Sequence, residues 1–277
     1  MNWYSSSMRP PSNCIDTCSS VAHRNESDPK MTAVFHREEE IDALRKRFAV
    51  RKSVLLHGPS GVGKTLLLEH VMPDFPHVLY CAQSSSSQAV FRSLAEVLAQ
   101  KKDTVILRKL GGRPAETIRQ KTAVSLKGIV LSVLRGTKYM VVLDHLHRPS
   151  HSFAAMVHEL MISCSVPVVA VARSAHMEDA GFVAPLFADR ADKLAIKNFD
   201  PETAQGFAKL SAEDLKLRAE NLDDFLTRLV EFSEGNPGAI ASMIDMATTS
   251  KYRLEDHIIV SPLYIDFRLR CAAANSE

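Results

Sequence analysis

One octapeptide limits what this chain can fold into more than any other feature: residues 58–65 read Gly-Pro-Ser-Gly-Val-Gly-Lys-Thr. This is the pattern G-x-x-x-x-G-K-[ST], in which glycines let the backbone curl and aim N–H groups at phosphate oxygens. The apolar run 53–57 predicts a short buried strand, and the run 66–71 predicts the opening of a helix. A strand, a glycine-rich loop and a helix in that order indicate a phosphate-binding P-loop, because the helix N-terminus adds partial positive charge.

The residue types of this loop have distinct chemical roles. Lys64 is expected to reach the β- and γ-phosphates of ATP, and the Thr65 hydroxyl is expected to ligate Mg²⁺. A chance glycine-rich turn before a helix would need no apolar run on either side. The predicted nucleotide-binding residues of the loop are Gly58, Pro59, Ser60, Gly61, Val62, Gly63, Lys64, Thr65 and Leu66.

Composition allows a folded chain but does not identify a partner. The 277 residues are 45% hydrophobic, enough for a packed core, and the net charge of +2 is too small to indicate nucleic acid or membrane binding. Five scattered cysteines imply no disulfide framework, which suits a reducing compartment. Because no apolar run is long enough for a membrane span and no secretory signal is evident, we expect a cytoplasmic protein without a membrane partner.

The pattern of the chain divides it into four segments. Residues 1–30 are polar and predict a disordered tail, and residues 31–198 alternate helix and strand patterns, which is typical of an α/β layer fold. Residues 199–250 predict a small helical domain. Residues 251–277 have no assigned role, and their apolar stretch 258–266 is either a strand packed on the helical part or a docking segment for a partner.

Periodicity and cap signals place the individual elements. The expected strands cover residues 53–57, 77–82, 139–143, 166–172 and 192–196. The expected helices cover residues 37–49, 66–71, 87–100, 116–134, 151–164, 182–188, 201–210, 223–232 and 238–247.

A second chemical signal lies at the predicted strand 139–143, which ends in Asp144. An apolar strand that delivers a carboxylate is the Walker B pattern, and Asp144 would hold Mg²⁺, through water, beside Thr65. The alternative is an Asp that only caps the next loop. Many ATPases place an acid after this Asp, whereas this chain has His145. A neutral imidazole can accept a proton near pH 7, but such a replacement more often slows hydrolysis, so either the enzyme is a slow switch or the base comes from elsewhere.

Arg173 follows the predicted strand 166–172, beside the strand that carries Asp144. An arginine at that position can hydrogen-bond the γ-phosphate and respond to its loss. The alternative is an exposed arginine at a strand end.

Taken together, these motifs resemble the AAA+/STAND superclass of P-loop ATPases over residues 33–248. Residues 34–44 look like the N-terminal box that borders the adenine, with Arg37 as its arginine and His36 where the family has Gly. Arg173 is similar to sensor 1, and Arg190 falls where the family carries an arginine finger.

The stretch Gly235-Asn236-Pro237 resembles the Gly-x-Pro motif that opens a lid helix in the STAND branch, so Pro237 joins the implied nucleotide site. The resemblance implies a three-layer α/β/α P-loop NTPase fold with a parallel sheet of order 5-1-4-3-2, followed by a small helical lid. It also implies that ATP and Mg²⁺ bind at the carboxyl ends of the strands.

Three functions compete. The first is an AAA+ ATPase that assembles in its ATP state, as a homo-oligomer, and remodels or recruits a protein or nucleic-acid partner. The second is a STAND-like switch that hydrolyses ATP slowly and signals by conformation. The third is a small-molecule P-loop kinase. Against it, the sequence offers no arginine-rich lid over the phosphates. No sequence feature identifies the partner.

Overall fold

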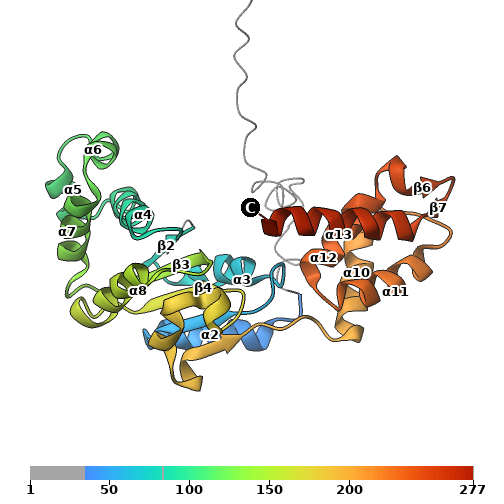
Figure 1. Cartoon of the computed structure of the whole chain (residues 1–277), viewed down its shortest axis with the longest axis horizontal. Helices are drawn as coiled ribbons and strands as arrows, with labels where there is room; N and C mark the ends of the chain where they lie inside the picture. The colour runs from blue at the N-terminus through green and yellow to red at the C-terminus, as the bar shows by residue number, and fades with distance from the viewer. Residues whose placement is uncertain (1–34, 83, 277) are drawn as a thin grey trace, which may run out of the picture.

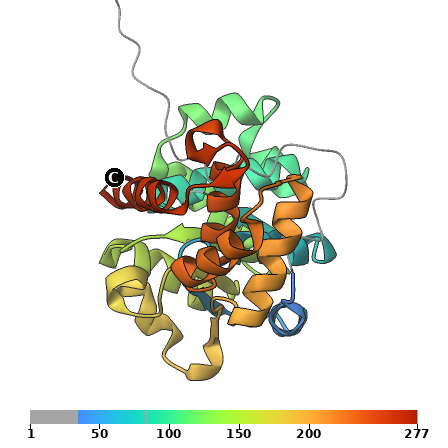
Figure 2. The same ribbon diagram turned by 90° about the vertical axis from the view of Figure 1, so that its right-hand side faces the viewer.

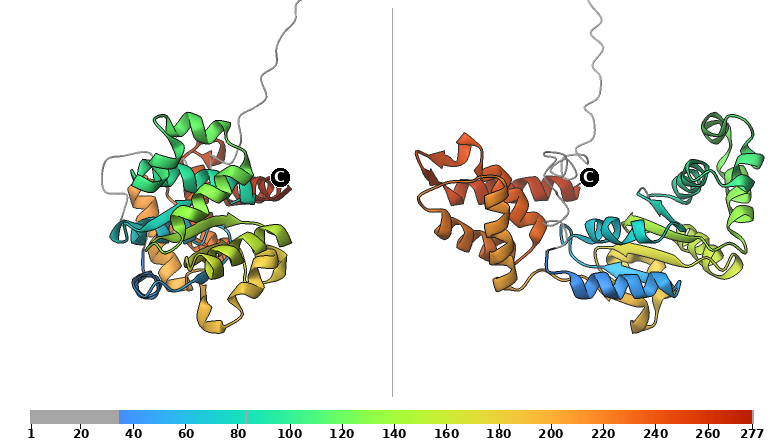
Figure 3. Two further views of the ribbon diagram at one scale, coloured as in Figure 1. Left: turned by 90° about the vertical axis from the view of Figure 1, so that its left-hand side faces the viewer. Right: turned by 180° about the vertical axis from the view of Figure 1, so that it is seen from behind.

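The structure, a computed structural model, describes residues 35–82 and 84–276 of the chain (Figure 1). The predicted disordered tail, residues 1–30, lies outside the described residues. Two parts lie side by side, an α/β part to residue 196 and a helical part from residue 201, with a linker between them (Figures 1 and 3).

A parallel five-stranded sheet forms the centre of the α/β part, in the order β2-β3-β4-β1-β5. Its strands are β1 (Val54–His57), β2 (Val78–Cys81), β3 (Met140–Leu146), β4 (Val168–Ala172) and β5 (Lys193–Ala195). From the other edge this order is 5-1-4-3-2, which confirms the fold class and topology that the resemblance implies. All five predicted strands are present.

Helices cover both faces of this sheet, as burial on both sides of parallel strands requires. Helices α2 (Glu38–Ala49) and α3 (Lys64–Val71) bury one face, where Leu56 and Val142 point. Helices α4 (Ser87–Gln100), α7 (Ala123–Leu134) and α8 (His151–His158) bury the other, where Leu55 and Val141 point. Adjacent residues of a strand are therefore buried in the cores on opposite faces of the sheet, because successive side chains of a strand point to opposite faces.

Short elements connect these layers. They are η3 (Met72–Asp74), α5 (Thr104–Leu110), α6 (Pro114–Gln120), the π-helical turn η4 (Glu159–Ser163), α9 (Met177–Ala180), η5 (Gly181–Phe187) and η6 (Arg190–Asp192). The helix expected at 182–188 is the 3-10 helix η5, and the expected 151–164 helix is α8 continued by η4.

The single helix predicted at 116–134 is wrong. The chain instead forms α6 and α7, because Lys121 is extended and the Thr122 hydroxyl accepts a hydrogen bond from the N–H of Ser125 as the N-cap of α7. Helix α5 was not predicted; Asp103 caps it by accepting from the N–H groups of Val105 and Ile106.

The helical part has its own hydrophobic core. Figure 2 shows its helices from the side that faces away from the α/β part. Helices α10 (Pro201–Asp214), α11 (Leu222–Ser233) and α12 (Pro237–Ala247) match the predicted ones, with ends shifted by up to four residues. Then follow η7 (Ser250–Tyr252), a small hairpin of β6 (Arg253–Leu254) and β7 (His257–Ile258), and α13 (Val260–Ser276).

The stretch 258–266 is mainly helix rather than the strand that was one of its two predicted forms. Leu263 of α13 is buried in the core of the helical part, and Tyr264 stacks on Phe232 of α11 with ring centroids 4.3 Å apart. The C-terminal segment is therefore packed into the helical part. None of the described helices is long and apolar enough to span a membrane.

Candidate nucleotide site

The loop between β1 and α3 has the backbone shape that its glycines permit. Gly61 and Gly63 have φ of 77° and 96°, values that favour glycine, and α3 begins directly after Gly63. The helix begins at Lys64, two residues before the predicted start. Its first N–H groups lack helical acceptors and carry partial positive charge, so they suit a phosphate.

Lys64 is held over its own loop. Its Nζ donates to the carbonyl oxygens of Gly58 at 2.7 Å and Pro59 at 2.9 Å. Burial lowers its pKa to about 8; the nearby positive charge of Arg173 adds to this, and Asp144 and Asp179 oppose it. Arg173 itself is exposed, directly after β4, and its contact with the terminal phosphate stays a prediction.

Thr65 and Asp144 meet although 79 residues separate them. The Thr65 hydroxyl donates to Oδ2 of Asp144 at 2.9 Å, and Asp144 is 1% exposed. The expectation that β3 ends at Asp144 is wrong: the strand continues to Leu146, with a register shift against β4 after Leu143. This irregularity places Asp144 inside the strand, with its carboxylate toward Thr65.

His145 follows in the left-handed region, with φ of 55°. Its N–H donates to Oδ1 of Asp144 at 2.7 Å, while its imidazole is 67% exposed, with Nε2 3.7 Å from Oδ2 of Asp144. The imidazole thus lies at the solvent-facing edge of the site, where a catalytic base could act.

Tyr80 was missed by the sequence reasoning. Its hydroxyl, at the carboxyl half of β2, donates to Oδ2 of Asp144 at 2.8 Å. Burial, together with the negative charge of Asp144, raises its pKa, so the phenol stays protonated. The available signal was a polar hydroxyl in an apolar strand that precedes the Asp144 strand in the chain.

Arg37, expected at the adenine, is 6% exposed and joins three segments. Its guanidinium donates to the carbonyl oxygens of Lys197 at 2.8 Å and Val62 at 3.4 Å, pairs with Glu40 at 2.9 Å, and lies 4.3 Å from the ring centroid of Phe199. These contacts attach α2 to the P-loop and the linker; contact with a base stays a prediction.

The N-terminus of α12 touches the P-loop directly. The N–H of Gly238 donates to the carbonyl of Gly61 at 2.9 Å, and the Asn236 amide donates to the carbonyl of Ser60 at 2.9 Å. Asn236 also caps α12 by accepting from the N–H of Ala239, and Pro237 is the first helical residue. Pro237 therefore lies between Asn236 and Gly238, the two residues of the helical part that donate hydrogen bonds to the loop.

Arg190 lies apart from this group. It is exposed, begins η6 and precedes β5 at the sheet edge. Within residues 35–82 and 84–276 it forms no ion pair, because Asp192 pairs with Lys52 at 2.9 Å and Asp189 accepts from the N–H of Ala191. Its guanidinium is thus available to another molecule.

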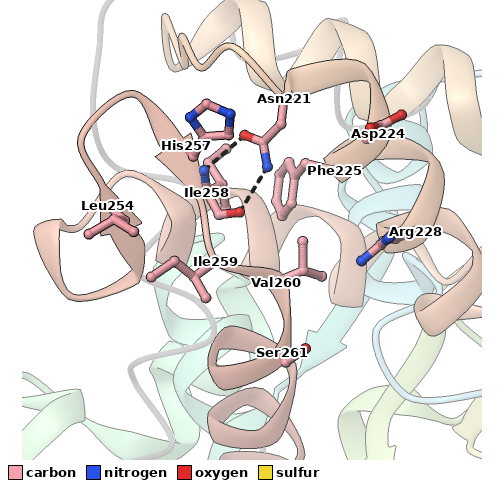
Figure 4. A pocket seen from close by; sticks show the side chains of 10 residues that line it. All are labelled: Asn221, Asp224, Phe225, Arg228, Leu254, His257, Ile258, Ile259, Val260 and Ser261. Carbon is pink, nitrogen blue, oxygen red and sulfur yellow. Dashed lines mark hydrogen bonds between the residues drawn. The ribbon is translucent and has the colours of Figure 1, made fainter.

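A pocket of about 550 Å³ lies in the helical part, between α11 and the β7–α13 segment (Figure 4). Phe225, Arg228 and Val260 line it, and the Asn221 amide there bonds both backbone groups of Ile258. No predicted nucleotide-site residue lines it, so this pocket is separate from the P-loop.

The comparisons with known proteins agree with this geometry. Residues 33–169 match the family described as AAA ATPase domain. This chain carries an AAA ATPase domain of the AAA+ P-loop class. No curated protein sequence matches the chain.

Three solved structures resemble the fold of this AAA ATPase chain. A Walker-type ATPase of Pyrococcus abyssi gives a TM-score of 0.56 at 14% identity, covering 87% of this chain and 75% of that one. The Cdc6p of Pyrobaculum aerophilum gives 0.54 at 14%, covering 86% and 65%. The Aeropyrum pernix Orc1 protein, solved in complex with DNA, gives 0.55 at 15%, covering 89% and 68%. At such identities the likeness shows the fold alone.

Proposed function

We propose that this AAA+ protein binds ATP with Mg²⁺, hydrolyses it slowly, and uses the cycle to assemble with itself and to recruit or remodel a macromolecular partner. The observation that carries the proposal is the 2.9 Å hydrogen bond between Thr65 and Asp144, directly beside Lys64. It unites the P-loop hydroxyl with the buried carboxylate of a neighbouring strand, as a metal-assisted phosphoryl-transfer site needs.

The chemistry of these residues fits the group they would hold. The Thr65 hydroxyl and the Asp144 carboxylate supply the oxygen atoms that Mg²⁺ prefers, the first directly and the second through a water molecule that the metal would keep. When bound, Mg²⁺ would neutralise charge on the β- and γ-phosphates. On nucleotide binding, Nζ of Lys64 would donate to phosphate oxygens in place of the carbonyl oxygens of Gly58 and Pro59. These charge-assisted hydrogen bonds would offset the cost of burying the lysine charge.

The residue after Asp144 supports the proposal of slow turnover. A carboxylate there would orient the attacking water, whereas the exposed His145 imidazole is a weaker and less defined acceptor. Asp179 is a second carboxylate whose charge acts on Lys64. Either group is a candidate base.

A STAND-like switch is the second candidate, favoured by the contact of α12 with the P-loop. Because Gly238 and Asn236 bind loop carbonyls, movement of the loop on ATP binding would reach the helical part directly. The kinase alternative has no comparable support. DNA is the first partner to test, because the fold resembles an Orc1 protein solved with DNA. A cytosolic location remains part of the proposal.

The test is a fluorescent-ATP titration followed by phosphate-release assays without and with duplex DNA, RNA and candidate proteins. Lys64→Ala is the control variant and should abolish tight binding. Phosphate release without a small-molecule acceptor supports an ATPase, and stimulation by one polymer identifies the partner class. Unchanged nucleotide affinity in Lys64→Ala would remove the assigned site.

A further inference from the structure

Tyr80 lies where two strands of the sheet meet the P-loop helix. In the parallel pairing of β2 with β3, Tyr80 is opposite Val142, two residues before Asp144. Its ring packs on the core shared by α2, α3 and the sheet, while its hydroxyl reaches Oδ2 of Asp144 at 2.8 Å. Packing therefore fixes the ring and aims the hydroxyl.

The Tyr80 hydroxyl is one of three donors to the Asp144 carboxylate. Oδ2 accepts from Tyr80 and Thr65, and Oδ1 accepts from the N–H of His145. A carboxylate offers about four acceptor positions. Among the described residues, the two hydroxyls occupy both positions of Oδ2 and leave one on Oδ1. The carboxylate is thus held by three donors in a single orientation.

We propose that Tyr80 is a positioning residue of the magnesium site, holding the Asp144 carboxylate in the orientation in which it and Thr65 bind the metal. This inference rests on the proposed function. Hydrogen bonds that orient metal-binding groups commonly change metal affinity by 10- to 100-fold when removed. Without the Tyr80 hydroxyl, Oδ2 gains a vacant acceptor position and the carboxylate loses one of three restraints.

If Tyr80 instead hindered metal binding, removing its hydroxyl would change the metal affinity in the opposite direction. If the Tyr80 hydroxyl stood where a metal-bound water must sit, it would compete with the metal, and removing it would tighten metal binding. The positioning role requires weaker binding. A single variant, Tyr80→Phe, separates the two because it keeps the packed ring and deletes only the hydroxyl.

The chain provides a matched control in Tyr139. Its hydroxyl donates to Asp103 at 2.9 Å, and burial raises its pKa to about 12, yet Asp103 caps α5 and takes no part in the site. Tyr139→Phe therefore removes an equivalent tyrosine–carboxylate bond elsewhere. Thermal melting of both variants measures any general loss of stability.

The experiment titrates Mn²⁺ into the full chain with a non-hydrolysable ATP analogue and follows free Mn²⁺ by electron paramagnetic resonance. We expect Tyr80→Phe to weaken Mn²⁺ binding about 10-fold or more, with analogue affinity in EDTA unchanged, and Tyr139→Phe to match the wild type. Asp144→Asn should weaken binding further, and adding Tyr80→Phe to it should cause no additional loss, because Tyr80 acts through Asp144.

Three results would overturn the inference: unchanged or tighter Mn²⁺ binding in Tyr80→Phe, an equal loss in Tyr139→Phe, or an additive loss in the double variant. An additive loss in the double variant would show that Tyr80 acts without Asp144. If the wild type itself bound neither the analogue nor Mn²⁺, the proposed function would fail instead, so the two failures are distinguishable.

Discussion

The N–H of Gly238 donates to the carbonyl oxygen of Gly61 at 2.9 Å, so the first turn of α12 rests on the P-loop. The approach is too close for a side chain, because a Cβ on Gly238 would lie 2.7 Å from the Gly61 oxygen and 2.8 Å from its Cα. The helical part is thereby attached to the loop expected to cradle phosphate.

Gly238→Ala should therefore separate α12 from the loop. Overpacking of this kind commonly costs about 1–3 kcal/mol, and we expect a lower melting temperature and faster hydrogen exchange in the linker 197–200. Gly128→Ala is the control: Gly128 lies exposed within α7 with no atom near its would-be Cβ, so alanine should stabilise the helix by roughly 0.5–1 kcal/mol. Equal exchange in the two variants would argue against a lid contact.

ATP affinity should depend on pH through Lys64. Burial lowers its pKa to about 8, so the free protein loses this charge as the pH rises above 8. Because phosphate binding favours the charged form, affinity should be flat near pH 7 and fall by up to about tenfold per pH unit above 8. Equilibrium titrations between pH 7 and 9.5 measure this. Lys64→Arg, which stays charged, should show no such fall even if its affinity is lower.

His145→Glu should accelerate hydrolysis. A carboxylate next to Asp144 is a better base for the attacking water than an exposed imidazole, and general-base catalysis contributes about 10²–10⁴-fold where it is well placed. The φ of 55° at this residue is retained most easily by a side chain without β-branching, which glutamate satisfies. Single-turnover assays with Mg²⁺ should show the increase. A slower rate would instead identify His145 as the catalytic base, with His145→Gln as the matched neutral variant.

Arg190→Ala should reduce turnover in an assembled state while sparing nucleotide affinity. The side chain is exposed beside the edge strand β5. Where an arginine is supplied to a neighbouring site, it stabilises the charge of the transition state and raises the rate of hydrolysis about 10³–10⁵-fold. Light scattering should show ATP-driven self-association in the wild type. Mixing Arg190→Ala with Lys64→Ala should restore part of the activity, because the first keeps its P-loop and the second keeps its arginine. A monomer at saturating ATP and Mg²⁺ would contradict this.

Local pattern was enough to determine the fold class. The octapeptide 58–65 predicted a loop between a strand and a helix, and the alternation of apolar runs predicted five strands, which the family resemblance arranged as a parallel sheet; all are present. These features are encoded within short windows, since glycine conformations, caps and side-chain periodicity depend on neighbours in the chain. The Walker B pattern predicted that Asp144 lies beside Thr65, and the two side chains are hydrogen-bonded in the structure.

Only the tertiary structure decided the contacts that complete the site. The irregularity in β3 that lets the strand pass Asp144 depends on its pairing with β4. The bond from Tyr80 to Asp144 depends on β2 lying beside β3. The Gly-x-Pro resemblance implied that Pro237 joins the nucleotide site, but the hydrogen bond from Gly238 to Gly61, 177 positions away, is set by how α12 packs on the loop. Such contacts form when separate elements bury their apolar faces together, and a single sequence contains no local signal for their distances.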